Sequence, residues 1–426
     1  ITPQTEQKPP SVPTSPPLLF SSQPPAMAAA AARERPTPLH AGLPDEIFIW
    51  EILLRLPPKA LLRCRAVCRG WRRATSSRDF LLAHHGRQPS LPLLYDRTNN
   101  DDGGVFLDIM PLDHRAGVAA AAQLQPIARF ASSHSFVRVE ASCDGLVIVG
   151  TVAANSVSSG DRHLSVCNPA TRQYAPLPLL TGFTLAGMYR HPPTGEYRLL
   201  LYPDDLYEPP PGAGYDCYLY ALGSREKPRH IGWPEAAEVI HTLDPVLFRD
   251  NMHWPIEEGE PESESGMIMV FDTTTEVFRF MRAPAVPGVA ELFEMDEMMG
   301  MASFNDEVTT VDIWTTKDYD AEVWAFRYQV GLPVAELTTR FGFDKYSNLV
   351  VSSWGDDVLL LVQSGEWLLQ IGIDGKLVAT FHRKLLGITS FRLKQTLVPH
   401  TFFPMLEGYV VNTWPFISPD DSVVNT

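Results

Sequence analysis

The residues of this chain that could carry out chemistry are twelve histidines, five cysteines and a few adjacent carboxylates. The histidines form no HxH or HExxH pattern, and no His/Cys spacing is typical of a zinc site. The sequence also lacks the GxSxG turn of a serine hydrolase and the glycine-rich loop of a nucleotide-binding protein. Asp101-Asp102 and Asp356-Asp357 lie beside glycine, where turns commonly use aspartate. These patterns indicate a non-catalytic binding protein without a metal or cofactor.

The five cysteines are scattered at positions 64, 68, 143, 167 and 217. This odd-numbered set lacks CxxC pairs, so we expect a reduced chain with free thiols. Cys64 and Cys68, four residues apart on a predicted helix, are expected to be small buried apolar residues rather than ligands. No run of about 18 apolar residues indicates a membrane span, and no signal peptide is recognisable. The composition therefore predicts a cytoplasmic or nuclear protein.

Charge is distributed unevenly along the chain, whose formal net charge is -15. Residues 43–88 contain nine Lys/Arg and four Asp/Glu and so carry +5, residues 1–42 carry +1, and residues 89–426 carry -21. A basic segment on an acidic body is attracted to an acidic partner. The acidic body argues against nucleic acid as its ligand, because phosphate contacts need clustered basic residues.

A helical module, predicted for residues 43–86, is the first element that could position a binding surface. Pro44 suits a first helical turn, and four apolar residues follow at the spacing of one helical face: Ile49, Ile52, Leu53 and Leu56. Pro57-Pro58 ends this helix and begins a second, and Trp71 belongs to a third. Three short helices are marginally stable alone, so we expect a partner to cover their surplus apolar surface.

The module resembles an F-box, because an LP start, an EILLRLP segment, LLRCRAVCRGWR and a trailing Phe occur in that order. The resemblance implies that the module docks on the Skp-type adaptor of a cullin–RING ubiquitin ligase, while the rest of the chain recruits an unknown target protein. It places ten residues at the adaptor contact: Leu43, Pro44, Ile47, Ile52, Leu56, Pro57, Leu61, Leu62, Val67 and Cys68. Trp71 is expected to brace the helices. The alternative is a plain three-helix bundle whose apolar residues all serve its own core.

Two further expectations concern this contact. One more residue lies between LP and EIL than in the common F-box pattern, so either Ile47 or Phe48 could fill the first adaptor pocket. Charging Leu56 and Leu61 together is expected to abolish adaptor binding while the rest of the chain stays folded. The adaptor family is acidic, in agreement with the basic charge counted for the module.

The rest of the chain repeats a strand, a polar turn and a second strand. This unit occurs at residues 165–178, 218–234, 269–284 and 368–382. Corresponding strand-end residues, Cys167, Tyr220, Phe271 and Ile371, are 53, 51 and 100 residues apart, and residues 311–328 fill the double step. A period near 50 with about four short strands predicts a β-propeller.

The segments NPATRQYAPLP and FDTTTEVFRF resemble the F-box-associated domain of plant proteins, over residues 90–412. The double glycine of ordinary kelch blades is absent. We therefore predict a multidomain α + all-β protein, with an N-terminal three-helix F-box followed by an antiparallel kelch-like β-propeller. LPLLYD is expected to pair with a strand in TFFPMLEGYVV to close the ring. Five tryptophans are expected to pack mainly between blades: Trp254, Trp314, Trp324, Trp354 and Trp367.

The remaining segments leave alternatives open. Residues 1–42 are predicted to be a disordered Pro/Ser/Ala-rich tail, and residues 413–426 a C-terminal tail. Either translation starts at Met27 or the sequence is a piece of a longer chain. The acidic segment 257–266 is either a solvated loop or a docking loop for a basic target. The alternative function is a propeller sensor for a small ligand or glycan, indicated by a central pocket with convergent polar groups and stacked tryptophan.

Overall fold

The structure is a computed structural model that describes most of the chain between Pro44 and Ile417. The described ranges are 44–99, 105–113, 124–132, 136–152, 162–203, 216–232, 244–256, 265–286, 290–295, 297–305, 307–344, 347–354, 357–412 and 416–417. The predictions for the tail 1–42, for Asp101-Asp102 and for most of segment 257–266 therefore concern residues outside the described part. So does most of the predicted tail 413–426.

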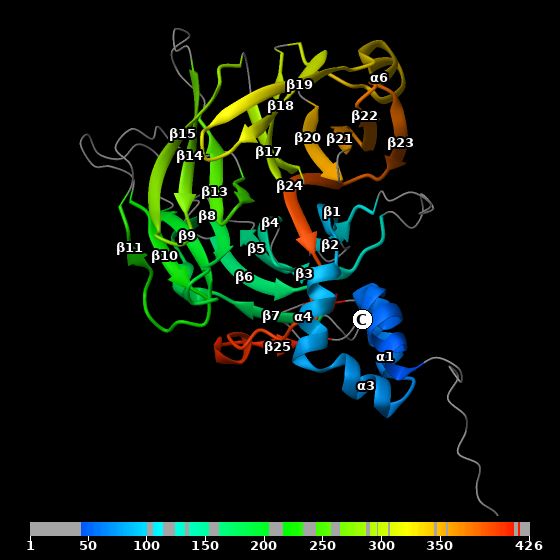
Figure 1. Ribbon diagram of the computed structural model, residues 1–426, viewed down its shortest axis with the longest axis vertical. Coiled ribbons are helices and arrows are strands. Elements are labelled where there is room, and N and C mark those ends of the chain that lie inside the picture. The colour runs from blue at the N-terminus through cyan, green and yellow to red at the C-terminus, as the bar shows by residue number, and fades with distance from the viewer. Residues whose placement is uncertain are drawn as a thin grey trace, which may run out of the picture.

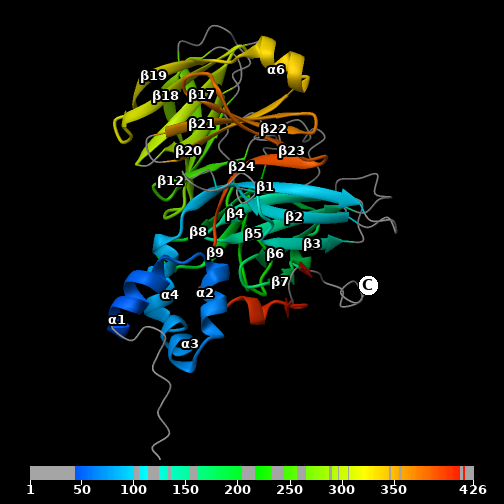
Figure 2. The same cartoon turned by 90° about the vertical axis from the view of Figure 1, so that its right-hand side faces the viewer.

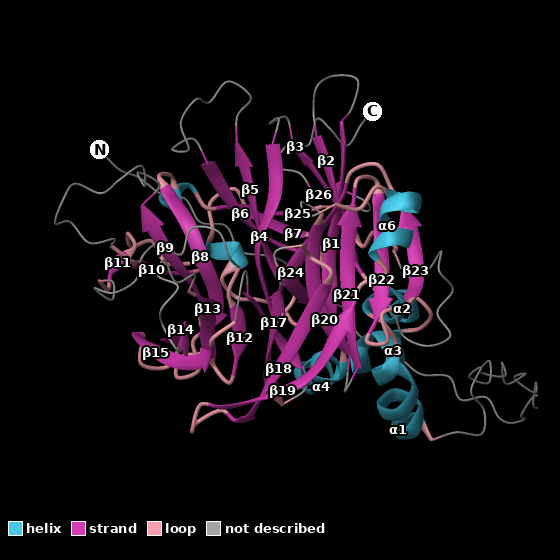
Figure 3. Cartoon of the chain, turned by 90° about the horizontal axis from the view of Figure 1, so that it is seen from above, coloured by secondary structure: helices cyan, strands magenta, loops and turns pink. Residues whose placement is uncertain are grey.

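The described N-terminal residues are helical. The first helical run comprises α1 (Asp45–Ile47), the π-helical η1 (Phe48–Ile52) and the 3-10 helical η2 (Leu53–Arg55), and it ends at the extended residue Leu56. It is followed by α2 (Pro58–Arg65), α3 (Arg69–Thr75) and α4 (Arg78–Arg87). The run and α2 and α3 correspond to the three predicted helices, and α4 adds a fourth. Figure 3 shows these helices together on one side of a strand-rich body.

The described strands form six sheets around a central axis, which is a six-bladed β-propeller (Figure 1). The pairing is antiparallel throughout except for one two-residue strand at the edge of a blade. Each blade has four main strands, which are named in order from the axis outwards. Blade 1 holds β4 (Phe136–Cys143), β5 (Leu146–Val152), β6 (Arg162–Asn168) and β7 (Gln173–Pro176). Blade 2 holds β8 (Phe183–Arg190), β9 (Tyr197–Pro203), β10 (Tyr218–Ala221) and β11 (Arg229–His230). Blade 3 holds β12 (Val246–Phe248), β13 (Asn251–Pro255), β14 (Ser265–Asp272) and β15 (Val277–Pro284).

The other three blades follow the same plan. Blade 4 holds β16 (Ala290–Met295), β17 (Met298–Phe304), β18 (Thr310–Asp318) and β19 (Val323–Gly331). Helix α6 (Val334–Phe341) leads to blade 5, which holds β20 (Asn348–Trp354), β21 (Asp357–Ser364), β22 (Trp367–Gly372) and β23 (Leu377–His382). Blade 6 holds β24 (Leu386–Lys394), β1 (Ser90–Asn99), β2 (Val105–Pro111) and β3 (Ala128–Ser132). Two short strands, β25 (Val410–Val411) and β26 (Phe416–Ile417), extend blades 1 and 6.

Strands from both ends of the chain close the ring. LPLLYD lies in β1 and pairs with β24, with Leu94 opposite Ile388. The predicted pairing of LPLLYD with TFFPMLEGYVV is therefore wrong. Residues 401–411 contain the 3-10 turn η5 (Phe403–Met405) and only the two-residue β25, which pairs with β7. The nine-residue β24 is long enough to pair along β1, and it contributes buried Ile388, Phe391 and Leu393.

The predicted repeat corresponds to the outer half of blades 1 to 5. Cys167, Tyr220, Phe271 and Ile371 lie on the third strands β6, β10, β14 and β22, and β18 fills the double step. In these turns, Asn or Asp side chains accept hydrogen bonds from backbone N–H groups, as the sequence indicated. Asp272 Oδ1 accepts hydrogen bonds from the backbone N–H groups of Thr274 and Thr275 at 2.8 and 3.1 Å. The turn then ends at Glu276 with φ of 59°.

The core of the propeller consists of apolar layers between adjacent blades. Trp254 is fully buried between blades 2 and 3, and Trp367 packs edge-on against Phe341 between blades 4 and 5. Trp314 and Trp324 pack partly buried against the layer between blades 3 and 4. These four tryptophans therefore pack between blades as predicted, whereas the side chain of Trp354 lies outside the described residues.

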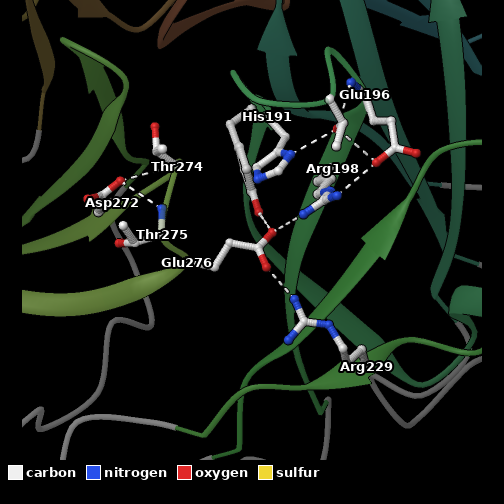
Figure 4. Close-up of polar contacts among 10 residues, drawn as sticks. His191, Glu196, Arg198, Arg229, Asp272, Thr274, Thr275 and Glu276 are labelled. Carbon is white, nitrogen blue, oxygen red and sulfur yellow. Dashed lines mark hydrogen bonds and ion pairs between the residues drawn. The ribbon is translucent and has the colours of Figure 1, made fainter.

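A carboxylate clamps blade 2 to blade 3, as Figure 4 shows. Glu276, from the turn between β14 and β15, accepts a hydrogen bond from the hydroxyl of Tyr189 at 2.9 Å and pairs with Arg198 and Arg229. Burial opposes ionisation of Glu276, but hydrogen bonds from Arg198 and Tyr189 outweigh it and lower the pKa. All four groups thereby have partners, so this cluster is a structural link between blades.

Candidate functional site

The helical module has a small core that the propeller completes. Five of its apolar residues are buried: Leu53, Leu54, Leu61, Phe80 and Leu81. Leu397, which follows β24, is 4% exposed and packs into the same cluster, with Val398 and Ala170 beside it. The propeller domain of this chain therefore covers part of the module's apolar surface, for which a separate partner was predicted. Figure 2 shows the helices lying against the strand-rich body.

Polar contacts fix the module and join it to blade 1. The carbonyl of Leu56 accepts a hydrogen bond from Nε2 of buried His84 at 2.8 Å, and burial lowers the pKa of His84. His85 Nε2 lies 3.6 Å from Oδ1 of Asp144, at the end of β4. Burial opposes ionisation of Asp144, but His85 and the Tyr197 hydroxyl lower its pKa on balance. The module is thus held to the ring by both apolar and charged contacts.

Around this filled core, six large apolar side chains remain 40–55% exposed. One is Leu82 on α4, and the other five are Ile47, Trp50, Ile52, Leu62 and Val67. We call these five residues the apolar strip. They belong to the first helical run, to α2 and to the turn after α2. A group of large exposed apolar side chains on one small folded module commonly marks a binding surface. The strip therefore gives the module a surface that is available to a partner.

The residues predicted to contact the adaptor differ in their exposure to solvent. Pro44, Pro57 and Cys68 are exposed, Leu56 is half-buried, and Leu43 lies outside the described residues. Leu61 is fully buried against the module's own core, so it has no surface to offer a partner. Its predicted place at the contact is corrected for that reason. Substituting a charge there would unfold the module and could not test binding.

The π-helical segment η1 accommodates the extra residue after Leu43-Pro44. An inserted residue commonly produces a one-turn π-bulge within a helix. Phe48 turns inward and stacks on Trp71, with ring centroids 4.6 Å apart, whereas Ile47 is exposed. Of the two open choices, Ile47 is thus the residue that faces solvent. Sequence reasoning missed Trp50, although its spacing of three residues from Ile47 was a usable signal.

The surroundings of the apolar strip are basic. Helices α2 to α4 expose seven cationic side chains: Lys59, Arg63, Arg69, Arg72, Arg73, Arg78 and Arg87. Cys68 is exposed and its Sγ accepts a hydrogen bond from the N–H of Trp71 at 3.4 Å, capping α3. The prediction that Cys68 is buried is therefore wrong, because the thiol serves as a helix cap. A partner that suits this surface is apolar at its centre and acidic at its margin.

Family comparisons match both parts of the chain. A family described as "F-box-like" matches residues 40–85, and one described as "F-box associated beta propeller domain" matches residues 119–375, more than half of the chain. The chain belongs to the F-box-associated β-propeller family. The helical module is accordingly an F-box-like module on such a propeller.

The chain is also similar to proteins of Arabidopsis thaliana that are named as F-box proteins. F-box protein At5g49610 is 24% identical over 311 residues, covering 67% of this chain and 78% of that protein. The putative F-box/kelch-repeat protein At1g13200 is 23% identical over 347 residues, covering 71% and 76%. Among solved structures, a prolyl endopeptidase matches 73% of this chain and 46% of its own at 11% identity, with a TM-score of 0.35. That score is too low to support an argument about chemistry.

Three further observations concern other classes of site. Within the described part of the chain, no group of three or more His, Cys, Asp or Glu side chains is arranged to hold a metal ion. All five cysteines are free. No described helix combines the length and apolar character needed to cross a bilayer.

Proposed function

We propose that this chain is a substrate-recognition subunit of an SCF-type (cullin–RING) ubiquitin ligase, located in the cytoplasm or nucleus. The F-box-like module docks on a Skp-type adaptor, and the propeller recruits a target protein. The chain itself performs no bond chemistry. It raises the local concentration of the target's lysines near the ubiquitin-loaded enzyme.

The observation that carries the proposal is the apolar strip. The core of the module is already complete, since Leu397 fills it from the propeller side. Burying the strip in the module's own core is therefore not an option for this fold, so the plain-bundle alternative is disfavoured. The basic rim agrees with an acidic adaptor.

The proposal retains two finer predictions. The division into an F-box module at 43–86 and a propeller domain at 90–412 follows the family resemblance. The kelch-like description is supported by At1g13200, whose name includes a kelch repeat. The firm attachment of the module to blade 1 would hold a recruited target in a defined position relative to the adaptor.

The experiment is a pull-down of the full chain with a purified Skp-type adaptor. Leu62→Glu combined with Val67→Glu should abolish adaptor binding, because both side chains are exposed and a buried unpaired carboxylate is costly at an interface. The double variant should keep the melting temperature of the unchanged protein. Retained binding by this folded variant would refute the proposed contact.

A matched control is available on the propeller. Leu179, 44% exposed on the short helix η4 (Pro178–Leu180) of blade 1, can receive the same substitution. Leu179→Glu should leave adaptor binding unchanged, since this residue lies outside the module. Equal loss of binding in the control and in the double variant would show that charge alone, rather than the strip, governs the result.

A further inference from the structure

Opposite blades of the propeller are joined across its central channel. The inner strands follow one another around the axis in the order β4, β8, β12, β16, β20 and β24, and β24 lies beside β4. Strand β12 of blade 3 is therefore opposite β24 of blade 6. Asp244, two residues before β12, accepts a hydrogen bond at Oδ2 from the hydroxyl of Ser390 on β24, at 2.6 Å. We call this contact the channel bridge.

The channel bridge borders a hollow part of the ring. A cavity of about 670 Å³ is lined by residues of all six blades, including Ser390 and Pro245, the neighbour of Asp244. The described lining residues include no tryptophan, so the stacked-tryptophan sign of a glycan site is not met. Other hydrogen bonds join neighbouring blades, such as the bond from the Ser142 hydroxyl to the Arg392 carbonyl at 2.8 Å. A contact between blades 3 and 6 restrains these opposite blades from moving apart, which contacts between neighbours do less directly.

A second carboxyl group interacts electrostatically with the channel bridge. Glu291, on β16 of blade 4, accepts a hydrogen bond at Oε2 from the backbone N–H of Val351 on β20, at 3.3 Å. Within the part of the chain that the structure describes, neither Asp244 nor Glu291 forms an ion pair. Burial raises the pKa of Glu291 to about 8, and the negative charge of Asp244 adds to this shift. Ionisation of Glu291 therefore brings a second negative charge to the bridge.

The other charged groups that act on the bridge come from blades 1 and 2. Glu140 on β4 pairs with Arg138 at 2.6 Å, and Arg162 lies 3.8 Å from the same carboxylate. Burial raises the pKa of Asp244 although water reaches its side chain; Arg138 opposes this shift and Glu140 adds to it. The charges of Asp244 and of Tyr202 on β9 act in turn on Arg138. Because Arg138 is shared with Glu140, it only partly compensates the carboxylate of the bridge.

We propose that the channel bridge is a proton-dependent restraint on the propeller ring. While Glu291 carries its proton, Asp244 remains in the channel and holds the Ser390 hydroxyl. When Glu291 loses the proton, repulsion between two carboxylates favours a position of Asp244 outside the channel, and the contact between blades 3 and 6 is lost. The ring is then held by contacts between neighbouring blades. This proposal does not depend on adaptor binding.

The first test follows the stability of the full chain as the pH rises towards 8. The pKa of Glu291 is higher in the folded chain than in the unfolded chain, so the folded chain binds this proton more tightly. The resulting stabilisation is complete below about pH 4.5, the ordinary value for glutamate, and is lost as the pH rises to about 8. Urea titrations from about pH 6.5 to 8 should show the unfolding constant rising by at most about tenfold per pH unit.

A variant and a matched control assign this pH dependence. Glu291→Gln keeps an oxygen acceptor for the Val351 N–H group but cannot ionise, so it should remove most of the change in the unfolding constant between about pH 6.5 and 8. Glu297→Gln makes the same change in net charge at an exposed glutamate of the same blade and should keep the dependence of the unchanged chain. Equal pH profiles for these two variants would overturn the proposal.

A second test separates the channel bridge from a merely buried carboxyl group. Ser390→Ala removes the hydroxyl donor, so amide exchange in β12 and β24, corrected for the intrinsic effect of pH, should become about tenfold faster at pH 6.5. Exchange in these strands should then no longer accelerate between about pH 6.5 and 8, whereas in the unchanged chain it should. Strands β14 and β18, which lie in the outer halves of their blades, should keep their protection. If Ser390→Ala left the exchange of β12 and β24 and its pH dependence unchanged, the bridge would not be the restraint.

Discussion

Leu397→Ala is expected to loosen the F-box-like module without opening the blades. Leu397 is 4% exposed and packs against the buried leucines of the module and Phe80. Truncating a buried leucine to alanine costs about 2–5 kcal/mol, and a small core between two packed units should lie near 3 kcal/mol. Since 1.4 kcal/mol corresponds to a factor of ten, the opening equilibrium of the module should rise about a hundredfold.

The assay is amide hydrogen exchange, read separately for helices α2 to α4 and for strands far from the contact, such as β14 and β18. Faster exchange is expected in the helices alone. Leu385→Ala, at a leucine 40% exposed before β24, is the matched control and should change stability by less than about 0.5 kcal/mol. Unchanged helix protection in Leu397→Ala, or equal losses across all blades, would refute the reasoning.

Three further changes test the propeller. Glu276→Gln should lower the free energy of unfolding by about 1–3 kcal/mol, because Arg198 and Arg229 lose a charged acceptor; an unchanged urea midpoint would contradict the clamp. Burial lowers the pKa of His253 to about 4. As the pH falls, the histidine is therefore protonated in the unfolded chain before it is protonated in the folded chain, and the free energy of unfolding should decrease from pH 6.5 towards pH 4. His253→Gln should flatten that slope in denaturant titrations. Gly145→Ala should lower the melting temperature, because φ is 83° and a Cβ would meet the Lys394 carbonyl.

Local patterns in the sequence predicted the repeat of the propeller. Turn residues such as Asp272 accept hydrogen bonds from backbone N–H groups two and three positions away, so a short stretch of sequence is enough to predict the turn. The spacing of Cys167, Tyr220 and Phe271 then follows from the size of one blade. The closing pair β1 and β24 could not be predicted in this way, because about 290 residues separate its strands and several apolar segments compete for the same edge.

The candidate sites were predictable only where helical spacing dominates. Ile52, Leu62 and Val67 are exposed, as a contact surface requires. The sequence could not show which of Leu61 and Leu62 is buried, because both are leucines and only the packing of α2 decides between them. Trp50 could have been identified from its spacing of three residues from Ile47, although the π-helical η1 departs from regular α-helical spacing.

The order of the strands in blade 6 has a consequence for synthesis. Strands β1, β2 and β3 leave the ribosome early, but they must wait for β24 before the ring can close. Leu397, only three residues after β24, then completes the core of the F-box-like module. A chain ended at Lys394 would keep β24 but lack Leu397, so we expect its F-box-like module to be more open to proteolysis. Completion of the propeller and of the residues after it thereby becomes a condition for a stable F-box-like module, and pulse proteolysis of a chain ended at Lys394 would measure the difference.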